Sequence, residues 1–283
     1  MPPQASASQQ HLLAPTRDRV RHGPNGWLGL AVPVALVALW AAITATGVVS
    51  PRILPTPGAV ATAAVAFLFG DATTTLPGVI RFEGAGLFHI AASLRRLLVA
   101  FALAAAVGVP LGLALGLSRR LALVLDPLVQ ALRPIPIFAW LPLGLAWFGL
   151  GEGAARFLIF IGSLFPIVVS TADGVMRVPR AWAETALMLG TPRSQLPRRI
   201  YLPATLPSIV TGLRLGLTLG WMSVIVGELT GTRRGLGAMM MAAREVGRLD
   251  RVIVGMAFFA LLGLGTDLLV RRVSRRFTRW ASS

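Results

Sequence analysis

Long apolar blocks separated by short polar stretches constrain this chain more than any other feature of its sequence. The blocks are about twenty residues long, which is the length that an α-helix needs to cross a bilayer. Of the 283 residues, 55% are hydrophobic and 13% are charged, whereas soluble domains carry about a quarter charged residues. A soluble helical protein would also place polar residues in every turn of such a block. The sequence therefore predicts an all-α integral membrane protein.

Six of the blocks are predicted to be transmembrane helices. The third is rich in proline and is expected to be short and irregular, because non-helical backbone at membrane depth is tolerated where it is buried in protein or lines a cavity. Residues 1–26 are polar and are predicted to form a flexible cytoplasmic tail, and residues 27–283 form the transmembrane domain. The predicted spans are 27–49, 94–117, 133–150, 155–172, 208–227 and 252–270.

The net charge of +16 results from 27 basic residues and 11 acidic ones. All 27 basic residues are arginines, because the chain contains no lysine. Short bursts of arginine between apolar blocks mark the cytoplasmic side of a membrane protein, whereas a nucleic-acid-binding protein gathers them on one face of a polar domain. Fifteen arginines fall in segments predicted to be cytoplasmic and ten in segments predicted to be external, Arg95 and Arg96 among the latter. This bias predicts cytoplasmic N- and C-termini, although the loop 231–251 is unusually basic for an external loop. No nucleic-acid partner is expected.

The missing residue types exclude several kinds of chemistry. Without lysine there is no P-loop, so ATP and its magnesium ion would be bound by a separate subunit. Without cysteine there are no disulfides and no cysteine-ligated metals, and histidine occurs only at His11, His22 and His89. We therefore expect no catalytic residue, no metal site and no cofactor in this chain.

Two glycine ladders indicate close helix packing. A four-residue spacing leaves one helix face without side chains, so that a neighbouring backbone can approach closely. Packing within one subunit and a seam between two subunits are both compatible with this pattern. The ladders are Gly108, Gly112 and Gly116 in the second predicted span, and Gly212, Gly216 and Gly220 in the fifth.

The eleven acidic residues all fall in loops or near the ends of predicted spans. Glu228 and Arg214 share the fifth span, but the rise of the helix separates them by about 21 Å, so they cannot pair within it. Asp267 precedes Arg271 by four residues, which predicts a local ion pair. We therefore expect no buried carboxylate that could act as a proton relay at mid-membrane, which disfavours a proton-coupled transporter and leaves a sodium-coupled one open.

The most specific pattern lies in the loop between the fourth and fifth spans, residues 173–206. It reads Glu184-Thr185-Ala186, three residues, Gly190, nine residues, and Ile200-Tyr201-Leu202-Pro203. We predict a short helix over residues 179–189 that ends near Gly190 and presents Ala186 and Leu187 outward. A loop this long in a small membrane protein indicates a surface that binds a partner protein.

This pattern resembles the signature of the permease subunits of binding-protein-dependent ABC importers, which is Glu-Ala-Ala, three residues, Gly, nine residues, Ile-x-Leu-Pro. The chain departs from it only at Thr185. The resemblance covers about residues 90–275 and implies the six-helix type I ABC importer permease fold. In that family the loop forms a coupling helix that docks on the cytoplasmic ATPase. By resemblance this role falls to Glu184, Thr185, Ala186, Leu187, Gly190, Ile200, Leu202 and Pro203.

The same resemblance implies the partners and the location of the chain. We expect a second copy of the chain, two copies of an ABC ATPase subunit, and a periplasmic or lipid-anchored solute-binding protein. The complex would lie in the cytoplasmic (inner) membrane of a bacterium. A stand-alone ion-coupled carrier or channel, working without an ATPase, is the alternative.

Short runs of sequence narrow the expected substrate. The runs Leu132-Arg133-Pro134-Ile135-Pro136 and Ala243-Arg244-Glu245 resemble aliphatic sulfonate permeases, in a branch that also handles taurine and nitrate. Other relatives carry pyrimidine precursors or bicarbonate. Trp140, Trp147 and Trp221 are candidates for lining the substrate path, although aromatic residues of membrane proteins more often face lipid.

Overall fold

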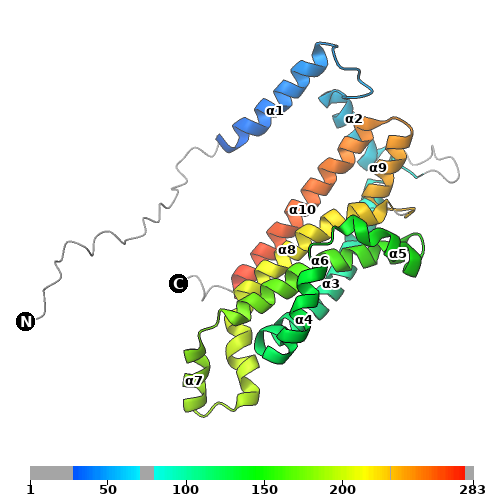
Figure 1. The fold of residues 1–283 in the computed structure, drawn as a ribbon. Coiled ribbons are helices and arrows are strands. Elements are labelled where there is room, and N and C mark those ends of the chain that lie inside the picture. The colour runs from blue at the N-terminus through cyan, green and yellow to red at the C-terminus, as the bar shows by residue number, and fades with distance from the viewer. Residues whose placement is uncertain (1–27, 71–79, 230, 278–283) are drawn as a thin grey trace, which may run out of the picture.

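The structure is a computed structural model that describes residues 28–70, 80–229 and 231–277 (Figure 1). The predicted cytoplasmic tail, residues 1–26, lies outside the described residues. Every regular element within the described ranges is helical, and the predicted all-α fold class is confirmed. The α-helices are α1 (Leu28–Ala45), α2 (Pro57–Phe69), α3 (Gly86–Leu117), α4 (Arg119–Leu132), α5 (Leu141–Phe148), α6 (Glu152–Met176), α7 (Arg180–Met188), α8 (Leu202–Glu228), α9 (Leu236–Glu245) and α10 (Leu249–Phe277). Three short segments of other helix types are η2 (Ile137–Trp140), η3 (Arg193–Gln195) and the π-helical η4 (Pro197–Tyr201).

Four helices of the described chain are long and apolar enough to cross a membrane: α3, α6, α8 with the short segments before it, and α10. A fifth candidate is the pair formed by Arg119–Leu132 and Ile137–Phe148, which bends by 99° and is a broken span or a re-entrant loop. This pair corresponds to the third, irregular span that the sequence predicts. The apolar part of α1, Ala31–Ala45, is shorter than the roughly twenty residues of a full span. The predicted six spans are thus four complete helices, one broken pair and one shorter apolar helix.

The long helices α3, α6, α8 and α10 run side by side (Figure 1). Helix α6 has its most extensive contacts with α3 and α8, and α10 packs against α2, α8 and α9. The main core joins these helices around Phe67, Leu97, Ile159 and Trp221. Helix α1 extends away from the bundle (Figure 1). Its Trp40 Nε1 donates a hydrogen bond at 3.0 Å to the carbonyl of Pro55, which precedes α2 by two residues.

The two ends of the bundle differ in structure. Helix α7 projects from one end, between the last turn of α6 and the segments that lead into α8 (Figure 1). Helix α9 and part of α2 lie at the opposite end (Figure 1). The predicted coupling loop therefore lies at one end of the bundle. Glu152, where α6 begins, and Glu228, where α8 ends, lie at the other end.

Candidate functional site

The short helix predicted in the long loop is α7, and it ends in a Schellman motif. The Thr191 backbone N–H donates to the Ala186 carbonyl at 2.9 Å, and the Gly190 N–H donates to the Leu187 carbonyl at 3.0 Å. This motif needs a left-handed residue, and Gly190 has a φ of +85°. A side chain at Gly190 would meet no atom within 4 Å. The glycine is therefore required by the backbone conformation and not by crowding.

Helix α7 and its C-cap present large apolar side chains to solvent. The exposed fractions are 52% for Trp182, 87% for Met188 and 82% for Leu189. Apolar side chains exposed on a short helix outside the bundle are typical of protein–protein or membrane interaction sites. The structure thus supplies an unpartnered apolar surface at the place where the motif predicts docking.

The predicted outward position of Ala186 is wrong. Ala186 is buried together with Ala183, one turn earlier on the same helix face. Helix α7 packs against η4, and these small side chains allow the returning chain to lie close. Leu187 is half-buried. Of the remaining motif residues, Glu184 and Thr185 are exposed, whereas Ile200 in η4 and Leu202 and Pro203 at the start of α8 are half-buried.

The two glycine ladders of α3 and α8 both face α6. A methyl group added at any of the six glycines would lie between 2.5 and 3.0 Å from an atom of α6, which is closer than van der Waals contact. At Gly112 the obstructing atoms are the Thr171 Cβ and the Val168 carbonyl oxygen, both at 2.6 Å. Helix α6 is therefore held between two flat helix faces within one subunit. The six glycines that pack against α6 are Gly108, Gly112, Gly116, Gly212, Gly216 and Gly220.

A buried ion-pair network joins α3, α6 and α8 at the end opposite α7. The Arg96 side chain is 1% exposed and donates from Nη1 to Glu228, whose side chain is fully buried, and from Nη2 to Glu152 at 2.5 Å. Glu228 accepts two further hydrogen bonds, from Ser93 Oγ and from the Gly237 N–H, each at 2.6 Å. Buried charges are tolerated when they are paired and hydrogen-bonded in this way.

This network corrects the predicted external position of Arg96, and it contains a buried carboxylate near a helix end. Arg96 does not lie in an external loop, because α3 begins at Gly86, nine residues before Arg95 and eight residues before the predicted start of the second span. Glu228 is a buried carboxylate, although it stands at the last residue of α8 and not at mid-span. A signal was present in the sequence: His89, Ser93 and Arg96 recur at helical spacing and form one polar stripe on an otherwise apolar helix.

The same stripe anchors the segment that leads into α9. The Gly235 N–H donates to His89 Nδ1 at 3.1 Å, and the Leu236 N–H donates to Ser93 Oγ at 2.9 Å. Because His89 Nδ1 accepts a hydrogen bond, the proton of the neutral ring is on Nε2, which donates to the Arg81 carbonyl at 2.6 Å. The turn before α9 is thus fixed by side chains of α3.

A second ion pair lies nearer to the α7 end, between α8 and α10. The predicted local pair of Asp267 and Arg271 is present at 3.3 Å. Asp267 also accepts from Arg214 Nε at 2.8 Å, across the two helices. The side chains of Arg214 and Asp267 are 35% and 25% exposed, so this pair is less buried than the pair of Arg96 and Glu228.

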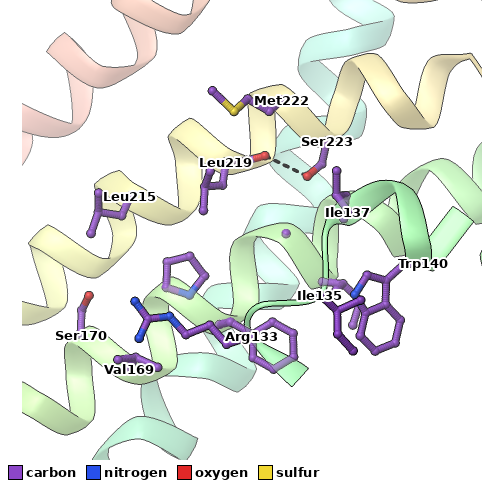
Figure 2. Close-up of a pocket in the computed structure, with 14 residues that line it drawn as sticks. Arg133, Ile135, Ile137, Trp140, Val169, Ser170, Leu215, Leu219, Met222 and Ser223 are labelled. Carbon is purple, nitrogen blue, oxygen red and sulfur yellow. Dashed lines mark hydrogen bonds between the residues drawn. The ribbon is translucent and has the colours of Figure 1, made fainter. Parts of the chain in front are cut away.

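The three candidate tryptophans lie in different environments. Trp140 lines a cavity of about 430 Å³ between the proline-rich segment, α6 and α8 (Figure 2). Trp147 is exposed on α5. Trp221 is buried in the core, where its Nε1 donates to Thr266 Oγ1 at 2.9 Å. Of the three, Trp140 alone lines this cavity.

Comparison with known proteins agrees with this architecture. Residues 108–279 match the family described as "Binding-protein-dependent transport system inner membrane component". The chain is 34% identical, over 94% of both chains, to the putative aliphatic sulfonates transport permease protein SsuC of Bacillus subtilis (strain 168). It is 35% identical, over 89% of both, to the taurine transport system permease protein TauC of Escherichia coli (strain K12). An inward-facing structure of the MetNI methionine ABC transporter shares the fold, with a TM-score of 0.59, 20% identity, and coverage of 67% of this chain and 94% of that chain.

The chain therefore belongs to the family of binding-protein-dependent transport system inner membrane components. Its relatives are the permease subunits of ABC importers in the sulfonate and taurine branch, as the motif resemblance implied.

Proposed function

We propose that this chain is the membrane-spanning subunit of an ATP-driven importer for a small solute. The favoured solute is an aliphatic sulfonate, and taurine and nitrate are the alternatives. The sulfonate, taurine and nitrate permeases among its relatives support these substrates. The chain itself carries out no covalent chemistry in this scheme. ATP and magnesium bind to a separate ATPase subunit, because the chain has no lysine for a P-loop.

The observation that carries the coupling role is helix α7 with its exposed Trp182, Met188 and Leu189. In the proposed complex this surface docks on an ATPase, and two copies of the chain sit over two ATPase subunits. A solute-binding protein delivers the substrate to the opposite end of the bundle. This orientation places α7 and both chain termini on the cytoplasmic side, in agreement with the arginine bias of the sequence.

The coupling role is tested by comparing two glycines that serve the same backbone motif. Gly247 closes α9 as Gly190 closes α7: its φ is +71°, and the Arg248 N–H donates to the Ala243 carbonyl at 2.9 Å. Valine at either position imposes left-handed strain of about 1–2 kcal/mol. We expect Gly190→Val to lower the substrate-stimulated ATPase rate of the reconstituted complex at least fivefold, and Gly247→Val to leave it near the parent rate. Both variants should insert in the membrane.

Equal ATPase rates for the two variants would remove the coupling role from α7. The rival, a stand-alone carrier or channel, makes a different prediction: liposomes that contain this chain without its ATPase would take up the substrate. Uptake that needs both the ATPase and ATP supports the importer.

A further inference from the structure

The cavity beside Trp140 combines an apolar wall with a single cation. It holds about 430 Å³ and lies between the proline-rich segment, α6 and α8, within the size range of small-molecule sites. Most of its lining is apolar, and one arginine stands at its edge (Figure 2). The side chains that give the wall its character are Ile137, Trp140, Phe165, Leu215, Leu219 and Met222.

The cation is Arg133, and it has no carboxylate partner among the described residues. Its backbone is fixed at the C-cap of α4, where its N–H donates to the Val129 carbonyl at 2.9 Å. Figure 2 shows its side chain reaching from the proline-rich segment toward Val169 and Ser170 of α6. Arg133 is exposed, and ionisable residues of a membrane protein that face a cavity within the membrane region mark substrate or ion paths.

A second cavity lies nearer to the α7 end and shares Ser170 with the first. Ser170 also lines a neighbouring cavity of about 250 Å³, together with Asp173, Arg177, Ser208 and Thr211. This second cavity lies between the last two turns of α6 and the first three turns of α8. Ser170 thus lines both cavities, and the second cavity places polar side chains of α6 and α8 nearer to the coupling loop.

We propose that Arg133 binds the anionic group of the transported solute and that the apolar wall contacts its alkyl part. The ligand class is an aliphatic monoanion with an oxyanion head, such as an alkanesulfonate. A guanidinium offers several N–H donors in a plane and pairs with two oxygens of one oxyanion at once. The cavity has one positive charge and a long apolar wall, which fits a molecule that has one negative charge and a hydrocarbon tail. This inference rests on the proposed importer function.

The test uses the reconstituted importer with its ATPase and binding protein, and butane-1-sulfonate as the probe. We expect Arg133→Gln to lower ATP-dependent uptake at least tenfold and Arg133→Lys to restore part of it. The matched control is Arg119→Gln: Arg119 stands at the other end of α4, is exposed, and also has no ion-pair partner in the described part of the chain. Uptake by Arg119→Gln should stay within about twofold of the parent.

A second variant tests the apolar wall and does not depend on Arg133. Leu219→Asn should raise the KM for butane-1-sulfonate at least fivefold relative to the KM for methanesulfonate, because the polar group removes contact with the longer alkyl chain. Uptake at the parent rate by Arg133→Gln would overturn the anion site, and so would an equal loss in Arg119→Gln, which indicates a general effect of surface charge. A parent complex that imports none of these probes with ATP would instead refute the proposed function.

Discussion

Replacing Arg96 by methionine should destabilise the bundle strongly. Methionine keeps most of the apolar stem of the arginine but removes the cation that neutralises Glu228. The carboxylate is fully buried, so it cannot recover the lost interaction from solvent. Breaking a buried pair by removing one partner costs about 3–5 kcal/mol. Because a change of 1 kcal/mol shifts the midpoint of thermal unfolding by about 2–4 °C in a chain of this size, the midpoint should fall by about 6–20 °C.

The matched control is Arg214→Met, which breaks the pair with Asp267. That pair is partly exposed, so its loss should cost less than the loss of the fully buried pair. Thermal unfolding of the purified, detergent-solubilised protein, followed by circular dichroism at 222 nm, measures both variants. The double variant Arg96→Met/Glu228→Gln should be more stable than Arg96→Met, because the glutamine side chain is neutral and can still accept from Ser93. Equal midpoints for Arg96→Met and Arg214→Met would refute the reasoning.

The remaining predictions concern packing and docking. Gly112→Ala should lower the unfolding midpoint, because its methyl group would meet the Val168 carbonyl at 2.6 Å and overpacking costs about 1–3 kcal/mol. Gly265→Ala in α10, where nothing lies within 4 Å, should leave the midpoint unchanged or raise it; an equal fall in both would contradict the packing argument. Met188→Glu should reduce co-purification of the ATPase with the chain at least fivefold without changing the unfolding midpoint, and retained co-purification would show that α7 does not dock there.

The features that the sequence predicts well are local ones. The helix around Glu184 is defined by residues within one loop, and the glycine that ends it is needed for a left-handed turn that a few neighbouring hydrogen bonds complete. The glycine ladders follow from a four-residue spacing within single helices. The burial of Ala186 was not predictable in the same way, because it depends on where η4 returns beside α7.

The buried network shows why other features were missed. Arg96 and Glu228 are 132 residues apart in the chain, and no local pattern indicates that their helices bring them together. The adjacent arginines Arg95 and Arg96 are assigned to a loop by the positive-inside rule, because that rule considers charge alone. The helical spacing of His89 and Ser93 with Arg96 was the evidence that their segment is helical and partly buried.

The packing of α6 determines how a displacement of α7 can reach the cavity. The glycine ladders hold α6 against both α3 and α8 at backbone distance, and close-packed helices of this kind move together and do not deform. Helix α7 lies in the chain between α6 and α8, so a pull on α7 acts on the whole group of three helices. The wall of the cavity that carries Arg133 and Trp140 belongs instead to the bent segment between α4 and α5. Movement of α6 and α8 relative to that segment would therefore change the width of the cavity, and we propose this as the rigid-body route by which force at the coupling loop would reach the proposed substrate site.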